Sequence, residues 1–330
     1  MLRYIYILAS AALLLAACTK TDVTYDAPSE IAFTPVAEGM TKAAVGAGNT
    51  LPTDQDLSIW ANYAEVGNSD AKVGDPYLDG VQYEYADGYW LNADCFWPKS
   101  GTLTFAGCTT PTTGDPNYDN DSNTITVYGF EQSNLTKESI DLMWFNRTTP
   151  VNHNGTEASL AIEMKHALAW ITIKAYGASG SKDWLITNIT MDNVVLGGDV
   201  ECTTANGAEW DIVETDSATE DETDNDIVIY NSTTGKKIGQ DPDATVENTE
   251  NGTLLIPQIP KTIYVSYKTS SEGAVTTKPL NLKISDDDNL WKAGVHYTYT
   301  IFFNPYKIDF TVSQDDGVGG WTSGGTITVQ

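Results

Sequence analysis

The sequence has few of the residues that binding to nucleic acid requires. Of its 330 residues only 18 are lysine or arginine, against 45 aspartates and glutamates, and the formal net charge at pH 7 is −27. Binding to phosphate groups depends on clustered basic side chains, so a surface of this charge repels nucleic acid and anionic membranes. We therefore exclude nucleic acid as a partner and interpret the acidity as a feature that favours solubility.

Residues arranged for catalysis or for metal binding are also scarce. The 3 histidines belong to no H-E-x-x-H pair, and no G-x-S-x-G segment is present. Asp119 begins a run that looks like a calcium loop, but Thr124 stands where such a loop requires glycine. We predict no enzyme, no cofactor and no metal site. A secreted hydrolase with two converging carboxylates is the least favoured alternative, because 45 acidic residues form chance pairs in any fold.

The N-terminal apolar run is too short to cross a membrane as a helix. It covers residues 4–15, follows Arg3 and leads into Leu-Ala-Ala-Cys at residues 15–18, whereas a spanning helix needs about 20 apolar residues. A secretory signal peptide at residues 1–17 is the better interpretation. The Leu-Ala-Ala-Cys end resembles a bacterial lipobox, which implies that the thiol of Cys18 is acylated and anchors the exported chain through lipid.

Apolar residues alternate with other residues in short runs that are separated by glycine, proline, asparagine and aspartate. Ile31 and Phe33 share one face of a predicted strand, and Leu57, Ile59 and Ala61 share one face of the next. Alternation of this kind is typical of antiparallel strands with one buried face, whereas helical periodicity is nearly absent. The sequence therefore predicts an all-β fold.

The length of the chain favours about two domains. A polar stretch at residues 146–157 separates two strand-rich halves, and we place the boundary there: an N-terminal domain at residues 18–155 and a C-terminal domain at residues 156–330. The strand after this boundary is unusual, because its apolar residues change from even positions such as Met164 to odd positions such as Ile171 and Ile173. Such a change requires a bulge or local burial of both faces.

The cysteines after Cys18 fit no zinc or redox spacing. An exported chain tolerates disulfides, so Cys95 and Cys108 could form one if they lie on neighbouring strands. Cys202 would then be a single buried thiol.

A set of short patches, in order along nearly the whole chain, resembles the fimbrillin family of Bacteroides-type (type V) pili, also called Mfa-like proteins. This chain has Cys108 where the family usually has an aromatic residue. The patches are the lipobox at Cys18, Ile31–Phe33, Met40–Ala43, Phe96–Pro98 with Leu103 and Phe105, Asp141–Met143, His166–Leu168, Leu255–Gln258, Trp291–Tyr299 and a terminal strand after Trp321.

The resemblance implies two tandem antiparallel β-sandwiches of transthyretin-like topology and assembly by donor-strand exchange. A lipidated precursor would reach the outer membrane, where a trypsin-like protease would cut between Lys42 and Ala43. The displaced first strand would be the one that carries Ile31 and Phe33, and a strand of another fimbrial subunit would replace it in a homo- or heteropolymer. These residues suit the scheme, since Lys42 lies in a segment rich in glycine, alanine and threonine.

The resemblance also implies a C-terminal donor strand. Gly324 and Gly325 could act as a hinge for Thr326, Ile327, Thr328 and Val329, in which the two apolar residues share a face. The main alternative function is a surface lipoprotein that binds glycans through exposed aromatic side chains, since the chain has 9 tryptophans and 17 tyrosines. Aromatic residues are also favoured in strands and in sandwich cores, so we prefer the fimbrial interpretation.

Overall fold

The structure is a computed structural model, and every regular element in its described part is a β-strand. In that part no helix is long and apolar enough to span a membrane. The described residues are 29–37, 51–65, 76–132, 141–153, 158–177, 184–212, 226–239, 252–260, 262–282, 291–303, 308–314 and 326–328.

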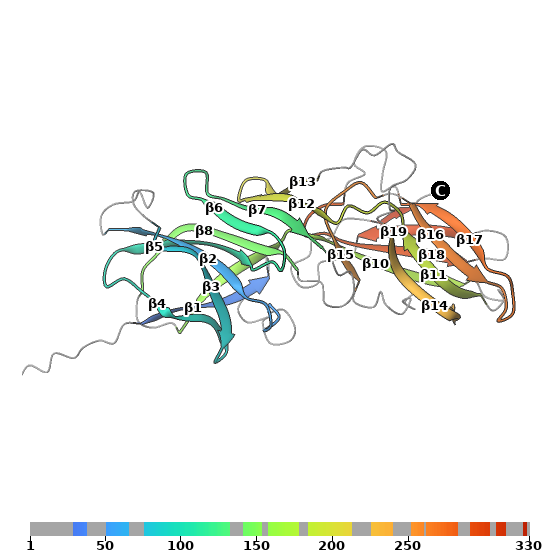
Figure 1. The fold of residues 1–330 in the computed structure, drawn as a ribbon, viewed down its shortest axis with the longest axis horizontal. Helices are drawn as coiled ribbons and strands as arrows, with labels where there is room; N and C mark the ends of the chain where they lie inside the picture. The colour runs from blue at the N-terminus through green and yellow to red at the C-terminus, as the bar shows by residue number, and fades with distance from the viewer. Residues whose placement is uncertain are drawn as a thin grey trace, which may run out of the picture.

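Seven strands close into a barrel in the order β1-β4-β3-β2-β5-β8-β9. It occupies one end of an elongated molecule (Figure 1). The barrel strands are β1 (Glu30–Ala37), β2 (Leu57–Ala64), β3 (Leu78–Ala86), β4 (Tyr89–Phe96), β5 (Thr102–Thr109), β8 (Met143–Val151) and β9 (Leu160–His166).

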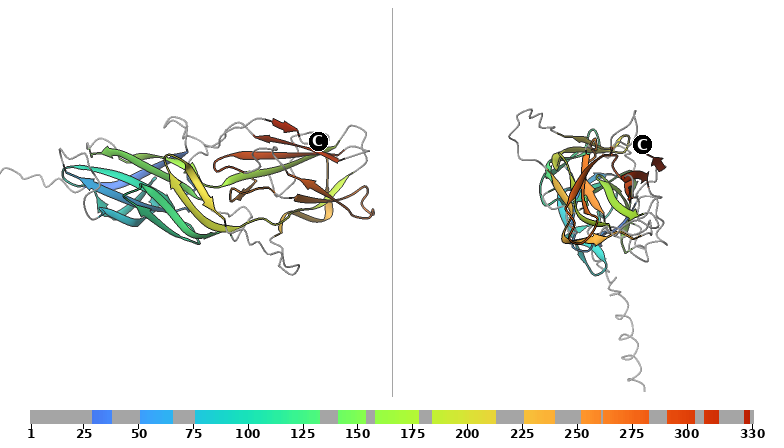
Figure 2. Two further views of the ribbon diagram at one scale, coloured as in Figure 1. Left: turned by 90° about the horizontal axis from the view of Figure 1, so that it is seen from above. Right: turned by 90° about the vertical axis from the view of Figure 1, so that its right-hand side faces the viewer.

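A four-stranded sheet in the order β13-β12-β7-β6 covers the outside of the barrel. Its strands lie along one side of the barrel in two views (Figures 1 and 2). They are β6 (Asp115–Asp119), β7 (Thr124–Glu131), β12 (Gly197–Thr203) and β13 (Gly207–Asp211).

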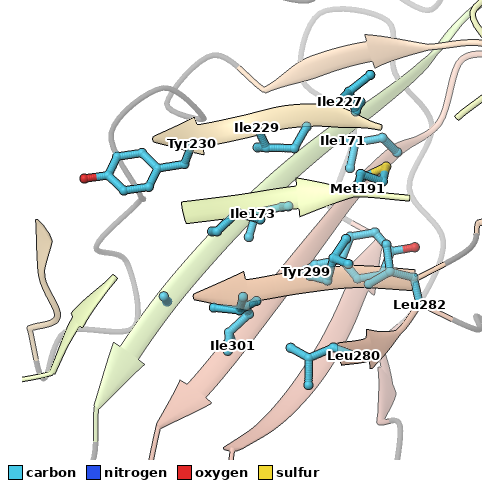
Figure 3. Close-up of a cluster of buried hydrophobic side chains, with 14 of the residues drawn as sticks. Ile171, Ile173, Met191, Ile227, Ile229, Tyr230, Leu280, Leu282, Tyr299 and Ile301 are labelled. Carbon is cyan, nitrogen blue, oxygen red and sulfur yellow. The ribbon is translucent and has the colours of Figure 1, made fainter. Parts of the chain in front are cut away.

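The other end of the molecule contains two further sheets, which enclose a core of their own. Residues from both sheets meet there, including Ile173 of β10, Met191 of β11 and Tyr299 of β18 (Figure 3). One sheet has the order β15-β10-β18-β19-β20 and the other β14-β11-β16-β17. The strands are β10 (Ala169–Gly177), β11 (Leu185–Met191), β14 (Ile227–Lys237), β15 (Thr253–Leu255), β16 (Thr262–Lys268), β17 (Thr276–Asn281), β18 (His296–Phe303), β19 (Ile308–Gln314) and β20 (Thr326–Thr328).

Strand β2 is buried on both faces. Leu57, Ile59 and Ala61 point into the barrel core, whereas Trp60 joins a second apolar layer between the barrel and the covering sheet. Trp144 of β8 lies in the same layer. The side chains on the outer face of the barrel strands are therefore not all polar, because this face also packs into an apolar core.

The change of parity after Met164 marks the passage of the chain from one core to another. Met164 lies in the barrel core, Ala167 and Leu168 in the layer under the covering sheet, and Ile171 and Ile173 in the core of the far end. The strand is interrupted between β9 and β10 at residues 167 and 168. The structure thus meets the predicted requirement for burial of both faces.

The all-β prediction is confirmed. The N-terminal strands form a closed barrel, where the resemblance implies a sandwich. The predicted boundary between residues 155 and 156 falls before β9, which pairs with β1 and β8, and β12 pairs with β7. Strands that follow the boundary are therefore shared with the N-terminal half, and the division into two domains stays a prediction.

The disulfide considered between Cys95 and Cys108 is not formed, because both thiols are free. Their strands, β4 and β5, are separated in the barrel by β3 and β2. Cys95 points into the barrel core, whereas Cys108 lies in the layer outside it. Cys202 is also buried and free, and it shares the layer outside the barrel with Cys108.

Candidate functional site

Strand β1 closes the barrel, because it pairs with both β4 and β9. It pairs in parallel with β9, where Phe33 lies opposite Leu160, and antiparallel with β4, where Phe33 lies opposite Trp90. Without β1, the strand edges of β4 and β9 would lose these partners, and unpaired edges readily accept another strand. The position of β1 therefore makes its surroundings a candidate strand-binding groove.

The inner face of β1 carries large apolar side chains into the barrel core. Ile31 and Phe33 are both 0% exposed. The Phe33 ring meets the ring of Tyr83 edge-on at 5.1 Å and that of Phe105 edge-on at 5.3 Å, between centroids, and it lies 6.4 Å from Phe145. Edge-to-face pairs at such distances add to the free energy gained from burial. Phe33 therefore fills a pocket with aromatic walls.

The groove is neutral and apolar. Burial raises the pKa of the Tyr83 hydroxyl far above its usual range, and nearby Cys95 raises it further. Tyr83 is thus uncharged at every physiological pH. An occupant of this groove gains free energy from apolar burial and backbone pairing rather than from charge.

One end of the groove has polar contacts that set the position of β1. The hydroxyl oxygens of Thr34 and Ser159 lie 2.6 Å apart, and the Trp97 N–H donates to the Ser29 carbonyl at 2.9 Å. A small pocket opens beside them, and Trp97 stacks there on His153 with 5.5 Å between ring centroids. These contacts fasten β1 at the barrel rim.

Other predicted site residues lie apart from the groove or outside the described residues. Cys18, Lys42, Ala43 and Val329 belong to the undescribed part of the chain. The remaining residues of the predicted donor strand, Thr326, Ile327 and Thr328, form β20 at the edge of its sheet, where Ile327 pairs with Val312 of β19. The structure therefore does not bring β20 and the groove of the same chain together.

Some walls of the groove are missed by reading the sequence. Tyr83 and Phe145 surround Phe33, yet the sequence indicates no role for them. Alternation in Val81-Gln82-Tyr83 predicts a strand with Tyr83 on one face. Alternation identifies a buried face but not the partner that it meets, so the groove itself is found only in the structure.

Alternative chemistry finds little support in the described part of the chain. It contains no group of three or more histidine, cysteine, aspartate or glutamate side chains placed to hold a metal ion. Among its tyrosines, the more exposed are Tyr77 just before β3, Tyr85 near the end of β3 and Tyr128 on β7, and its tryptophans are buried or half-buried. These residues do not form the shared aromatic platform that a glycan-binding surface needs.

The fold and the site define an all-β protein whose candidate functional site is an apolar groove filled by one of its own strands. A family model described as fimbrillin-like matches residues 41–322. The chain belongs to the fimbrillin-like family. No curated protein sequence matches it.

Solved structures agree with the fold. A fimbrial protein from Bacteroides vulgatus is 17% identical, with 87% of this chain and 98% of that chain covered and a TM-score of 0.58. A candidate cell adhesion protein from Bacteroides ovatus is 16% identical, with 88% and 97% covered and a TM-score of 0.51. Membership of the family supports a fimbrial subunit or adhesin role at the cell surface, in contact with other fimbrial subunits, and points to a structural rather than an enzymatic protein.

Proposed function

We propose that this chain is a structural subunit of a fimbria and that it assembles by donor-strand exchange after proteolytic removal of β1. The burial of Ile31 and Phe33 in the barrel core carries the proposal. A strand so deeply inserted cannot be lost without leaving an apolar groove and two unpaired strand edges. A donated strand would restore both kinds of contact at once.

The processing site suits this scheme. β1 ends at Ala37 and β2 begins at Leu57, and Lys42 lies between them in the sequence. A cut between Lys42 and Ala43 would leave β1 attached to the rest of the chain only by hydrogen bonds and packing. The lipid on Cys18 would go with β1, so the processed subunit would leave its anchor when the strand is displaced.

The donor in this scheme is the strand Thr326–Val329, of which β20 forms the described part. β20 pairs on one side with β19 and has no further strand beyond it within the described sheet. Its removal would therefore break one ladder and leave the rest of that sheet paired. The processing protease would be trypsin-like, and the partners would be other fimbrial subunits.

The test is limited digestion of residues 19–330 with a Lys/Arg-specific protease, followed by intact mass and by denaturing gels of unheated samples. We expect an early cut after Lys42, then ladders that survive detergent and collapse on boiling. A Lys42→Gln variant is the matched control, since it keeps Lys20, and a cut after Lys20 leaves β1 attached. Ladders of equal strength from the variant, or no cut at Lys42 in the intact fold, would contradict the processing scheme.

A further inference from the structure

The pocket that holds Phe33 has a definite size and shape. The rings of Tyr83 and Phe105 stand edge-on to Phe33, at 68° and 83° between planes. Both rings are themselves buried, and Trp97 packs edge-on against Phe105 at 5.7 Å between centroids. Walls so enclosed cannot collapse far onto a smaller side chain, so a smaller occupant leaves a void.

On the basis of the function proposed above, we propose that this groove selects a donor strand in which an aliphatic residue is followed two positions later by an aromatic residue. Such a strand comes from a different fimbrial subunit rather than from a second copy of this chain. The pattern is that of Ile31 and Phe33. Side chains of a strand alternate between its faces, so residues two apart enter the same core. The residue between them faces the opposite way.

The predicted donor strand of this chain does not meet the aromatic requirement. Residues 322–330 read Thr-Ser-Gly-Gly-Thr-Ile-Thr-Val-Gln and contain no aromatic residue. No register of these nine residues, in either direction of insertion, can therefore place an aromatic ring in the Phe33 pocket. With Ile327 in the position of Ile31, Val329 would occupy the pocket and leave much of it empty.

Strand β19 has an aliphatic and an aromatic residue at the right spacing, but the residue between them does not fit the groove. Ile308-Asp309-Phe310 repeats the aliphatic and aromatic positions of Ile31-Ala32-Phe33. In that register Asp309 would take the place of Ala32, which is only 7% exposed. Burying a carboxylate without a partner costs far more free energy than burying a methyl group. Neither of these two C-terminal strands of a second, processed copy is well matched to the groove, which favours a donor strand from another subunit.

The experiment measures peptide exchange into the groove of the otherwise intact chain. Residues 38–50 are replaced by a site for a specific protease, so that cutting leaves β1 in place but no longer joined to β2. Unlabelled peptides are added below the denaturant concentration that unfolds the protein, and release of the β1 fragment is followed by native mass spectrometry. The peptides are β1 (residues 29–37) and its Phe33→Val form, residues 322–330 and their Val329→Phe form, and residues 307–315 and their Asp309→Ala form.

We expect the β1 peptide to displace the fragment, and its Phe33→Val form to be weaker by about tenfold or more, since a rigid pocket is left partly empty. The Val329→Phe and Asp309→Ala peptides should gain by a similar factor over their parents. If the unmodified 322–330 peptide matched the β1 peptide, assembly with a second copy would be favoured and the proposal overturned. If the β1 peptide exchanged but the Val329→Phe peptide gained nothing, the selection by size would be wrong while strand exchange stood. Failure of every peptide, the β1 peptide included, would overturn strand exchange itself.

Discussion

Cys108 and Cys202 lie in the apolar layer between the barrel and the covering sheet. Burial raises the pKa of the Cys108 thiol from 9.0 to about 12. Burial also raises the pKa of Cys202 well above its ordinary value, and the nearby Cys108 adds to that effect. Both side chains therefore act as small apolar groups that stay protonated.

Because the pKa values of these thiols are raised in the folded protein, we predict a loss of stability at alkaline pH. Well below pH 9 both the folded and the unfolded protein keep the Cys108 proton, so the thiol adds no pH dependence there. Above pH 9 the unfolded chain ionises first, which favours unfolding until pH passes about 12. Between about pH 8 and about pH 10 we expect the free energy of unfolding, measured in urea, to fall less steeply for Cys108→Ala than for the parent. Equal slopes would contradict the assignment.

At the scale of elements, the turn between β6 and β7 is fastened to the barrel. The Asn62 side-chain amide donates to Asn120 Oδ1 at 2.6 Å, and the Asn146 amide donates to the Asn123 carbonyl at 2.6 Å. Asn123 itself has φ of 54°, in the left-handed region. Asparagine tolerates that region better than most residues. The turn thus holds one end of the covering sheet against β2 and β8.

We predict that this turn distinguishes two substitutions of Asn123. Asn123→Val should lower the free energy of unfolding by about 1–3 kcal/mol, because a β-branched residue is strained at positive φ. Asn123→Gly adopts that φ without strain and loses only the contact from the Tyr118 hydroxyl to Asn123 Oδ1, so it should cost less. Urea unfolding of the two variants checks the order. A glycine variant less stable than the valine variant would show that the side-chain contact dominates.

At the scale of the whole molecule, the chain passes between the two ends at several places, and Gln258 holds one of these passages, between β11 and β12. Gln258 is 2% exposed. Its side-chain amide donates to the carbonyls of Val195 and Ile256, at 2.9 and 3.1 Å, and its Oε1 accepts from Val195 N–H at 2.8 Å. Its own carbonyl accepts from Trp291 N–H at 2.9 Å. The passage between β11 and β12 is therefore held by a buried polar side chain to the segments after β15 and before β18.

We expect Gln258→Leu to uncouple the unfolding of the two ends. Loss of its side-chain bonds leaves the N–H and C=O groups of the half-buried Val195 without these partners, at a cost of up to about 1–3 kcal/mol for each group that water does not reach. Calorimetry should then resolve two transitions, or give a calorimetric enthalpy larger than the van't Hoff enthalpy. Gln82→Leu is the matched control, since Gln82 is exposed and bonds only to the Asp56 carboxylate among the contacts resolved for its side chain. A single transition at an unchanged midpoint would contradict the coupling.

The sequence by itself determined the all-β class and the faces of many strands, because alternation is a local property that follows from backbone geometry. It identified Ile31 and Phe33 as one apolar face, and the change of parity after Met164 as a place where burial changes. Only the tertiary structure decided that β1 lies between β4 and β9, that Cys95 and Cys108 face different cores, and that Tyr83 and Phe105 enclose Phe33. Contacts of this kind join residues far apart in the chain, and their free energy depends on the packing of the whole fold. Such packing leaves no periodic pattern in the sequence.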